Sequence, residues 1–228
     1  MAKIIVIEGV DGVGKSTQVF LLCNELKKQG YKVDILKFPT YDDSYSFLVK
    51  KHLGGELPSS CYYTRSLFWS LDRKLAWDNN WNDWRNKMSD PNQIFIFDRY
   101  VSGNIILQSF NMTNDEKKHY IHWLLDLEHR ILGIPEPDLT ILLDLDTELV
   151  IANLETRNQK LDIYENQNNI IAVNKHTKSV AATLGWKIVD CQDNDKMKTK
   201  REICLDIQKV INSQGVLSGV EQNKTIIG

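Results

Sequence analysis

The sequence lacks the cysteine and histidine patterns that disulfide frameworks and zinc sites require. Its four cysteines, Cys23, Cys61, Cys191 and Cys204, are scattered over 228 residues and form no C-x-x-C pair. The five histidines form no H-E-x-x-H motif. This spacing favours reduced thiols over disulfides or a zinc centre, so we expect a cytoplasmic protein.

Long apolar runs and an excess of charge of one sign are also missing. No segment approaches the roughly 20 consecutive apolar residues that a membrane-spanning helix needs. The apolar run from Ile4 to Ile7 stops at Glu8, without the features of a signal peptide. Lys and Arg total 28 against 30 Asp and Glu, a formal charge of −2. We therefore expect neither nucleic acid nor a membrane as a partner.

Short apolar segments that alternate with helical patterns predict an α/β fold. The predicted strands are 3–8, 32–38, 94–98, 139–144 and 186–190. The predicted helices begin near 15 and cover 67–84, 115–132, 149–157, 169–184 and a last segment around 203–211. This alternation predicts a mainly parallel five-stranded sheet with helices on both faces, and a binding site at the carboxyl ends of the strands.

The length of the chain predicts one domain. A chain of 228 residues buries one substantial core, and we place the domain at residues 1–212. Residues 213–228 are rich in Gly, Ser, Asn and Gln. This composition predicts a flexible carboxyl-terminal tail.

The strongest motif joins the first predicted strand to the first predicted helix. Residues 9–16 read G-V-D-G-V-G-K-S and match the P-loop motif G-x-x-x-x-G-K-[ST] in full. Lys15 is expected to reach the β and γ phosphates of ATP, and the Ser16 hydroxyl to ligate Mg²⁺. The expected ATP-binding residues are Gly9, Val10, Asp11, Gly12, Val13, Gly14, Lys15, Ser16 and Thr17. The fold class is then a P-loop NTPase-type three-layer sandwich.

A P-loop alone leaves GTPase switches, motors, nucleoside kinases and nucleotide kinases open. Residues 174–177 are similar to the guanine-reading N-K-x-D motif but lack its Asp, and they fall inside a predicted helix. We interpret this segment as solvated surface. No D-x-x-G switch sequence follows the third predicted strand, which also disfavours a GTPase.

The third predicted strand ends in an acid and an arginine, Asp98 and Arg99. A desolvated guanidinium needs an anionic partner. That partner is either Asp98, in a structural ion pair, or a substrate phosphate that the planar fork of Arg99 grips. Both hypotheses place charge beside the P-loop.

Several motifs, taken in order, resemble the thymidylate kinase family from Lys3 to about Asp190. The matching segments are E-G-x-D-G-x-G-K-[ST]-T-Q at 8–18, F-P at 38–39, an L-F-x-x-D-R type helix at 67–73, D-R-Y at 98–100, G-x-P-x-P-D at 133–138 and a lid that ends in Y-E at 164–165. The resemblance implies an ATP-dependent kinase that converts dTMP to dTDP. It also implies Mg²⁺ as the cofactor, a homodimer, and a lid at about 153–165.

The resemblance also assigns roles to residues. Catalysis falls to Lys15, Arg99 and Arg157, because Gly12 occupies the P-loop position where some members carry the catalytic arginine. Lys160 is the alternative lid cation. The implied acceptor-binding residues are Asp11, Phe38, Pro39, Trp69, Arg73, Arg99, Asn104 and Gln108, and the implied metal-binding residues are Ser16, Asp11 and Asp98.

Two tryptophan assignments have structural alternatives. Trp69 either stacks on the thymine ring, as the resemblance implies, or is a core aromatic of an amphipathic helix. Trp77, Trp81 and Trp84 are spaced i, i+4, i+7, and we interpret them as a packing or dimer face on that helix or its continuation.

Other functions stay open at this point. Thr40 and Leu107 stand where the family often has an arginine and an aromatic residue, so a broader-specificity monophosphate kinase is one alternative. A deoxynucleoside kinase is another, although a neutral nucleoside would offer no phosphate to Arg73 and Arg99. A non-catalytic ATP-binding module is the third.

Overall fold

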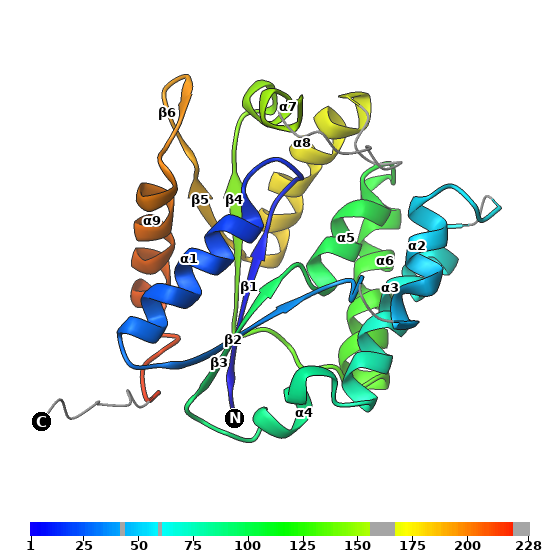
Figure 1. The fold of residues 1–228 in the computed structure, drawn as a ribbon. Helices are drawn as coiled ribbons and strands as arrows, with labels where there is room; N and C mark the ends of the chain where they lie inside the picture. Colours follow the sequence, from blue (N-terminus) through cyan, green and yellow to red (C-terminus); the bar gives the residue numbers. More distant parts are fainter. Residues whose placement is uncertain (42–43, 59–60, 156–166, 221–228) are drawn as a thin grey trace, which may run out of the picture.

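The computed structural model describes residues 1–41, 44–58, 61–155 and 167–220 (Figure 1). Five strands form one sheet in the order β2-β3-β1-β4-β5. Their bounds are β1 Lys3–Glu8, β2 Lys32–Lys37, β3 Gln93–Asp98, β4 Leu139–Asp144 and β5 Lys187–Asp190. Each pairing in this sheet is parallel, so the five predicted strands and their orientation are confirmed.

Helices cover both faces of the sheet. In Figure 1, α1 and α9 lie on one side, and α3, α5 and α6 lie on the other. The helix bounds are α1 Lys15–Lys28, α2 Phe47–Leu53, α3 Tyr62–Asp78, α4 Trp84–Lys87, α5 Val101–Ser109, α6 Asn114–Leu125, α7 Thr147–Glu155, α8 Gln167–Leu184 and α9 Lys200–Ser213. Two 3-10 turns, at 44–46 and 81–83, and a π-helical segment at 126–131 complete the helices of the described residues. The predicted three-layer α/β sandwich is confirmed.

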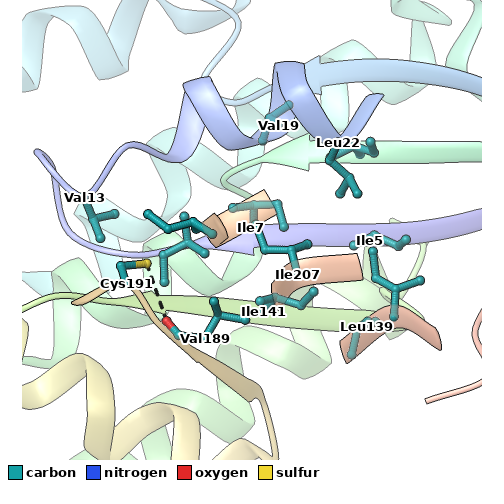
Figure 2. Close-up of a cluster of buried hydrophobic side chains, with 14 of the residues drawn as sticks. Ile5, Ile7, Val13, Val19, Leu22, Leu139, Ile141, Val189, Cys191 and Ile207 are labelled. Carbon is teal, nitrogen blue, oxygen red and sulfur yellow. Dashed lines mark hydrogen bonds between the residues drawn. The ribbon is translucent and has the colours of Figure 1, made fainter. Parts of the chain in front are cut away.

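The central strand sends alternate side chains into two core clusters. Ile5 and Ile7 pack into the cluster that includes Ile207 of α9 (Figure 2), whereas Ile4 and Val6 pack into the other cluster. Successive side chains of a strand point to opposite faces. A sheet covered on both faces therefore needs continuous apolar runs, which is the pattern that predicted these strands.

The predicted single helix from Leu67 to Trp84 is wrong in its bounds. α3 begins earlier, at Tyr62, and ends at Asp78. Within the polar segment 80–83, Asn80, Asn82 and Asp83 have φ values between 51° and 59°. Left-handed backbone angles cannot continue a right-handed helix, and Asn and Asp are among the residues that adopt them most readily.

The three tryptophans that follow Trp69 are confirmed as packing residues, although they do not share one helix. Trp84 is fully buried, and its ring centroid lies 5.6 Å from that of Phe38 and 4.7 Å from that of Trp77. The Trp81 ring lies 5.9 Å from Phe38. These rings close the core beneath the segment that follows β2.

The sequence did not predict α2, α5 or a small hairpin after β5. The hairpin pairs β6 Gln192–Asp193 with β7 Lys196–Met197 in antiparallel fashion. Almost every residue of α5 is buried. A helix that is buried all round has no polar face, so it lacks the periodic signal by which helices are recognised in a sequence.

The interpretation of residues 174–177 as solvated surface is wrong. Asn174 is 6% exposed, and its Nδ2 donates to the Leu145 carbonyl at 2.9 Å and to Thr147 Oγ1 at 3.0 Å. His176 and Thr177 are also buried. These contacts fix α8 to the turn between β4 and α7.

Turns follow α9 up to Gly219. Val216 and Leu217 are partly buried and Val220 is 8% exposed, all against the cluster that contains Ile5. Residues 221–228 lie outside the described part of the chain, so the predicted flexible tail is untested there. Among the described residues, the structure contains no helix with the length and apolar character needed to cross a bilayer.

Candidate active site

The P-loop lies at the carboxyl end of β1, the middle strand of the sheet. Gly14 precedes α1 with φ of 94°, and Gly12 has φ of 93°, both in the left-handed region that favours glycine. A Cβ on Gly12 would lie 2.9 Å from the carbonyl oxygen of Val150 in α7. The loop therefore has no space for an arginine at this position, and it presents the N-terminus of α1 as an anion site.

Lys15 lies folded over this loop. It is 6% exposed, and its Nζ donates to the Val10 carbonyl at 2.9 Å and to Asp11 Oδ1 at 3.2 Å. Burial lowers the pKa of Lys15, and the nearby Arg99 lowers it further. The structure thus brings the expected donor-side cation beside a second cation, Arg99.

Arg99 follows β3 and faces the P-loop. Its φ of 68° is uncommon for a residue other than glycine, and such angles cluster at functional sites. Its Nη2 donates to Asp11 Oδ1 at 2.5 Å. The hypothesis that Asp98 is the structural partner of Arg99 is therefore wrong, because the ion pair joins β3 to the P-loop instead.

Asp11 lies between two cations, Arg99 and Lys15. Burial opposes its negative charge, but both cations outweigh burial and hold the pKa of Asp11 below its usual range. Burial disfavours the charge of Arg99 as well, and Asp11 and Glu8 reverse this and raise the pKa of Arg99. Both shifts favour the charged forms of Asp11 and Arg99 at neutral pH.

Asp98 contacts the P-loop through a different residue. It is 3% exposed, and Ser16 Oγ donates to its Oδ2 at 2.5 Å. Lys37, which we did not predict, places its Nζ 3.8 Å from the same oxygen. A hydroxyl and a carboxylate are oxygen ligands of the kind that Mg²⁺ prefers, so Ser16 and Asp98 fit a magnesium ion. Asp11 is engaged by two cations, and its metal role stays a prediction.

Glu8, the last residue of β1, supports the segment around Arg99. It is fully buried and accepts hydrogen bonds from Ser102 Oγ at 2.8 Å and from the Tyr100 N–H at 3.2 Å. Burial raises the pKa of Glu8. The sequence placed Glu8 in a motif without giving it a role, and its contacts across the sheet could not be read from spacing.

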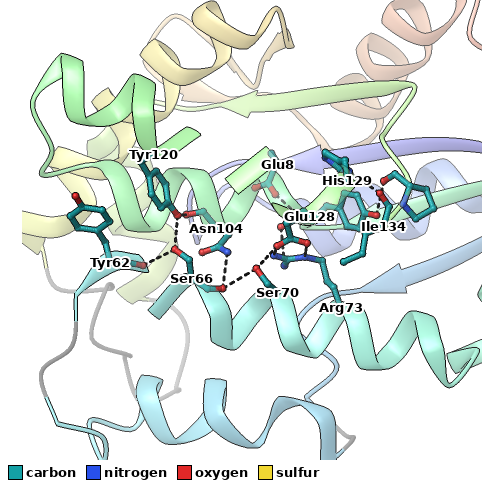
Figure 3. A network of polar contacts seen from close by, with 12 residues as sticks. Glu8, Tyr62, Ser66, Ser70, Arg73, Asn104, Tyr120, Glu128, His129 and Ile134 are labelled. Atoms are coloured by element: carbon teal, nitrogen blue, oxygen red, sulfur yellow. Dashed lines mark hydrogen bonds and ion pairs between the residues drawn. The ribbon is translucent and has the colours of Figure 1, made fainter. Parts of the chain in front are cut away.

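Arg73 is held inside the protein by Glu128 (Figure 3). Its Nε donates to Glu128 Oε2 at 3.0 Å and its Nη2 to Oε1, which also accepts from Ser70 Oγ at 2.7 Å. Its Nη1 points to the Tyr100 carbonyl, 3.4 Å away. Arg73 thus lies close to the D-R-Y segment, but its guanidinium faces a carboxylate, and its contact with an acceptor phosphate stays a prediction.

Glu128 lies in the π-helical segment at 126–131, and sequence reasoning did not find it. Such segments are rare and often occur at functional sites. Burial disfavours the charge of Arg73, and Glu128 outweighs it and raises the pKa of Arg73. No local motif marks a pairing across 55 positions of the chain.

Asn104 and Gln108 of α5 are fixed by α3. Asn104 is 2% exposed, and its Nδ2 donates to the Ser66 carbonyl at 3.1 Å (Figure 3). Within the described residues its buried Oδ1 accepts no hydrogen bond. Gln108 Oε1 accepts from Arg65 Nε at 2.7 Å. We did not predict Arg65, although its spacing of four and eight positions before Trp69 and Arg73 places all three along one helix face.

Trp69 packs beneath the short helix α2. It is 5% exposed, and its ring lies 5.5 Å from His52, nearly perpendicular to it. Burial lowers the pKa of His52, with a further contribution from Arg65. Stacking of Trp69 on a base stays a prediction.

The segment after β2 is also tied to α3. Phe38 packs in the aromatic cluster, and Pro39 follows it through a cis peptide bond. Thr40 donates to Asp72 through its N–H, at 3.1 Å, and through its Oγ1, at 2.6 Å. The acceptor roles of Phe38 and Pro39 stay predictions.

A cavity of about 20 Å³ lies between the P-loop, α5 and α8. Its lining includes Asp11, Arg99 and Leu107, together with Ile170 and Val173 of α8. The structure thus places Leu107, which we singled out for acceptor specificity, beside the two charged groups. Nothing in the sequence indicated that α8 would line this cavity.

Most of the predicted lid, with Arg157 and Lys160, lies outside the described residues. α7 ends at Glu155. The last turn of this helix contacts the P-loop, because Asn153 Nδ2 donates to the Gly12 carbonyl at 3.0 Å. The catalytic role of Arg157 therefore stays a prediction.

Comparison with known proteins assigns the chain to a family. The sequence model for thymidylate kinase matches residues 7–203. A thymidylate kinase of Mycobacterium tuberculosis is 33% identical over 150 residues, which cover 64% of this chain and 67% of that protein. A probable thymidylate kinase of Thermococcus gammatolerans is 26% identical over 231 residues, which cover 96% and 100% of the two chains.

A solved structure shares the fold. The structure of a thymidylate kinase from Candida albicans covers 94% of this chain and 93% of its own, with a TM-score of 0.68 and 22% sequence identity. A P-loop at the middle strand and an arginine at the end of β3 agree with this assignment. The chain therefore belongs to the thymidylate kinase family, and its reaction is the phosphorylation of dTMP by ATP.

Proposed function

We propose that this chain transfers the γ-phosphoryl group of ATP to dTMP in the space between the P-loop and Arg99. The observation that carries this proposal is the Arg99–Asp11 pair, which places a guanidinium beside the P-loop with one fifth of its side chain exposed. A planar guanidinium suits a phosphate oxygen pair. The acceptor phosphate is already anionic and is itself the nucleophile. The enzyme must therefore align the donor and acceptor phosphates and neutralise their charge.

The donor phosphates bind at the N-terminus of α1, on the backbone N–H groups of residues 9–17. Lys15 exchanges its present contacts, the Val10 carbonyl and Asp11, for the β and γ phosphates. Asp11 then remains paired with Arg99 or contacts the acceptor sugar. This arrangement assigns Lys15 to the donor phosphates and Arg99 to the acceptor phosphate.

Ser16 and Asp98 would hold the magnesium ion that accompanies ATP. Their oxygen atoms already lie 2.5 Å apart, because Asp98 ends β3 and Ser16, the last residue of the P-loop motif, lies in the first turn of α1. When bound, Mg²⁺ would offset the charge on the donor phosphates. Lys37 contributes a further positive charge near Asp98.

The acceptor base is read by Asn104, with Trp69 as the stacking surface. The Ser66 carbonyl fixes the Asn104 amide, so Oδ1 is left as a buried acceptor that needs a donor. Thymine and uracil carry an N3–H that can supply it, whereas N3 of cytosine carries no hydrogen. The residue thus favours dTMP and dUMP over dCMP. Leu107 in the cavity lining leaves more room at the sugar than an aromatic residue would.

The enzyme acts as a cytoplasmic homodimer in this proposal. Leu67, Leu71 and Leu75 form an exposed apolar stripe on α3, each about two fifths exposed. Such a stripe is typical of a surface covered by another chain. The described cysteines are free, and three of the four are buried, as expected for a reducing compartment.

The test is ADP release from ATP·Mg²⁺ with dTMP, dUMP, dCMP and thymidine offered separately. Turnover on dTMP and dUMP, with dCMP slower by at least tenfold, is expected. Turnover on thymidine alone would overturn the proposal in favour of a deoxynucleoside kinase. ATP binding without turnover on any acceptor would favour a binding module.

A further inference from the structure

Two buried amides of α5 face α3, one helical turn apart. Asn104 and Gln108 are 2% and 4% exposed, and their spacing puts them on the same face of the helix. Asn104 Nδ2 donates to the Ser66 carbonyl at 3.1 Å, and Gln108 Oε1 accepts from Arg65 Nε at 2.7 Å. The partners on α3 therefore decide how each amide is turned.

The chemistry of these two partners turns the amides in opposite senses. A carbonyl oxygen only accepts hydrogen bonds, so Asn104 must direct its NH₂ group to Ser66. Its buried Oδ1 accepts no hydrogen bond within the described part of the chain. A guanidinium only donates, so Gln108 must direct its oxygen to Arg65, and both of its amide hydrogens lie on the atom turned away from Arg65. α5 thus carries an acceptor and, one turn later, a donor.

Thymine and uracil carry the complementary pair of groups at one edge of the ring. Their N3–H donates and their C4 carbonyl accepts, whereas cytosine accepts at N3 and donates from its C4 amino group. An acceptor followed by a donor therefore matches thymine at two positions and opposes cytosine at both. With the N3–H group assigned to Asn104, the C4 carbonyl falls to Gln108.

The two amides differ in what holds them. The Ser66 carbonyl belongs to the backbone of α3, and Ser66 Oγ lies 2.7 Å from both the Tyr62 carbonyl and the Tyr120 hydroxyl (Figure 3). The oxygen of Gln108 is held by a side chain, that of Arg65. A substitution at Arg65 removes this contact and leaves the backbone of α3 in place.

We propose that Arg65 is a positioning residue for base specificity, which holds the Gln108 amide with its N–H donors toward the acceptor base. Arg65 acts through Gln108 and contacts neither the base nor the phosphate. The proposal rests on the proposed function, since it takes Asn104 for the N3–H group. Without Arg65 the amide rotates, and its oxygen then accepts from the amino group of cytosine.

Binding of thymidine and of dTMP separates this role from a direct contact with the phosphate. Isothermal titration calorimetry with both ligands is applied to the full chain and to Arg65→Ala. Loss of one oriented hydrogen bond raises the Kd for both ligands by the same factor, about threefold to tenfold. Arg201→Ala removes an exposed arginine from α9, on the other face of the sheet, and both affinities are expected to be unchanged.

Specificity gives a second readout. The ratio of kcat/KM for dTMP to that for dCMP is expected to fall about threefold to tenfold in Arg65→Ala. Gln108→Glu keeps an oxygen for Arg65 but offers no N–H donor, so the ratio should fall there too. A merely structural role of Arg65 lowers turnover of both monophosphates equally and keeps the ratio. Thermal unfolding checks that the variants fold, and Arg65→Met, which keeps the aliphatic stem, replaces the alanine variant if that one does not.

Three results overturn the proposal. Weakening of dTMP alone means that Arg65 binds the phosphate, unchanged binding of both ligands means that Gln108 keeps its orientation without Arg65, and an unchanged ratio means that the orientation does not select the base. Parallel weakening of thymidine and dTMP in a chain that phosphorylates no monophosphate would contradict the proposed function and leave the role of Arg65 supported.

Discussion

Two buried ion pairs around arginine differ in how closely the protein encloses them. The side chains of Arg99 and Asp11 are 20% and 34% exposed, whereas those of Arg73 and Glu128 are 1% and 0% exposed. Arg99 shares a single carboxylate oxygen with Lys15, but Arg73 uses two nitrogens against both oxygens of Glu128. The first pair is open to a ligand and the second is closed.

This difference in exposure indicates which arginine can exchange its carboxylate partner for a phosphate. A phosphate that reaches Arg99 leaves Asp11 partly hydrated and, as long as no ATP is bound, still paired with Lys15. A phosphate that drew Arg73 away would leave Glu128 buried and uncompensated, a cost of several kcal/mol. The resemblance implied a clamp of both arginines. The exposure of the two pairs favours Arg99 as the arginine that can exchange its partner for a phosphate, and the phosphate contact of Arg73 stays a prediction.

The largest expected effect is on stability. Glu128→Gln leaves the Arg73 charge buried without its counter-charge and should lower the free energy of unfolding by about 3–5 kcal/mol. Asp11→Asn, at the open pair, should cost about 1 kcal/mol or less. Urea unfolding of both variants measures the contrast. Similar losses would remove the distinction between a closed and an open pair.

Next in size is the loss of activity without Arg99. Arg99→Ala should lower kcat/KM for dTMP by about 10²–10³, because a preorganised positive charge on the reacting phosphates is lost. Arg130→Ala is the matched control, since Arg130 is 71% exposed and paired with Asp126 outside the site. Steady-state kinetics on both variants is the measurement. A comparable loss in the control would show that the effect is not local.

A smaller effect should appear in the binding of the acceptor phosphate. Arg99→Ala should weaken dTMP about tenfold to hundredfold, the range for a lost hydrogen bond to a charged group. Thymidine has no phosphate, and its affinity should not change. Calorimetric titration of both ligands measures these affinities. A lower affinity for thymidine in the variant would mean that Arg99 shapes the base pocket instead.

The smallest expected effect is on acid stability at the open pair. Arg99 and Lys15 hold the pKa of Asp11 in the folded protein below its value of about 3.9 in the unfolded chain. Its stabilising contribution is therefore present above about pH 4 and is lost as the pH falls toward the folded pKa. The stability difference between wild type and Asp11→Asn should shrink from pH 5 to pH 3. A constant difference would mean that the pair adds nothing through its charge.

Strand positions could be predicted because short apolar runs that end at a polar residue or proline are typical of buried strands, and the sequence has five of them. The P-loop could be predicted because its glycines and lysine are fixed by local backbone geometry. Helix α5 could not be predicted, since it is buried on all sides and its sequence therefore lacks the alternation of apolar and polar residues that marks a helix. The β6–β7 hairpin was missed because each strand has two residues, too short for any pattern.

Site residues divide in the same way. Arg99 was found because an arginine at the end of a buried strand is conspicuous in the sequence. The carboxylate that pairs with Arg99 was not found, because the sequence does not show whether Asp11 or Asp98 is the partner. The left-handed backbone at Arg99 directs the guanidinium toward the P-loop, where it pairs with Asp11. Glu128 had no local signal, since it pairs with a residue 55 positions away. Arg65 shares a helix face with Trp69 and Arg73, but its contact with Gln108 joins helices far apart in the chain.

The parallel α/β fold, the phosphate-binding loop and the thymidylate kinase assignment could be read from the sequence alone, because these depend on local periodicity and on motifs of fixed spacing. Which charges meet, Arg99 with Asp11 and Arg73 with Glu128, became known only from the folded structure. Ion pairing and burial depend on distances across the sheet and between helices, and those distances exist only once the chain has folded.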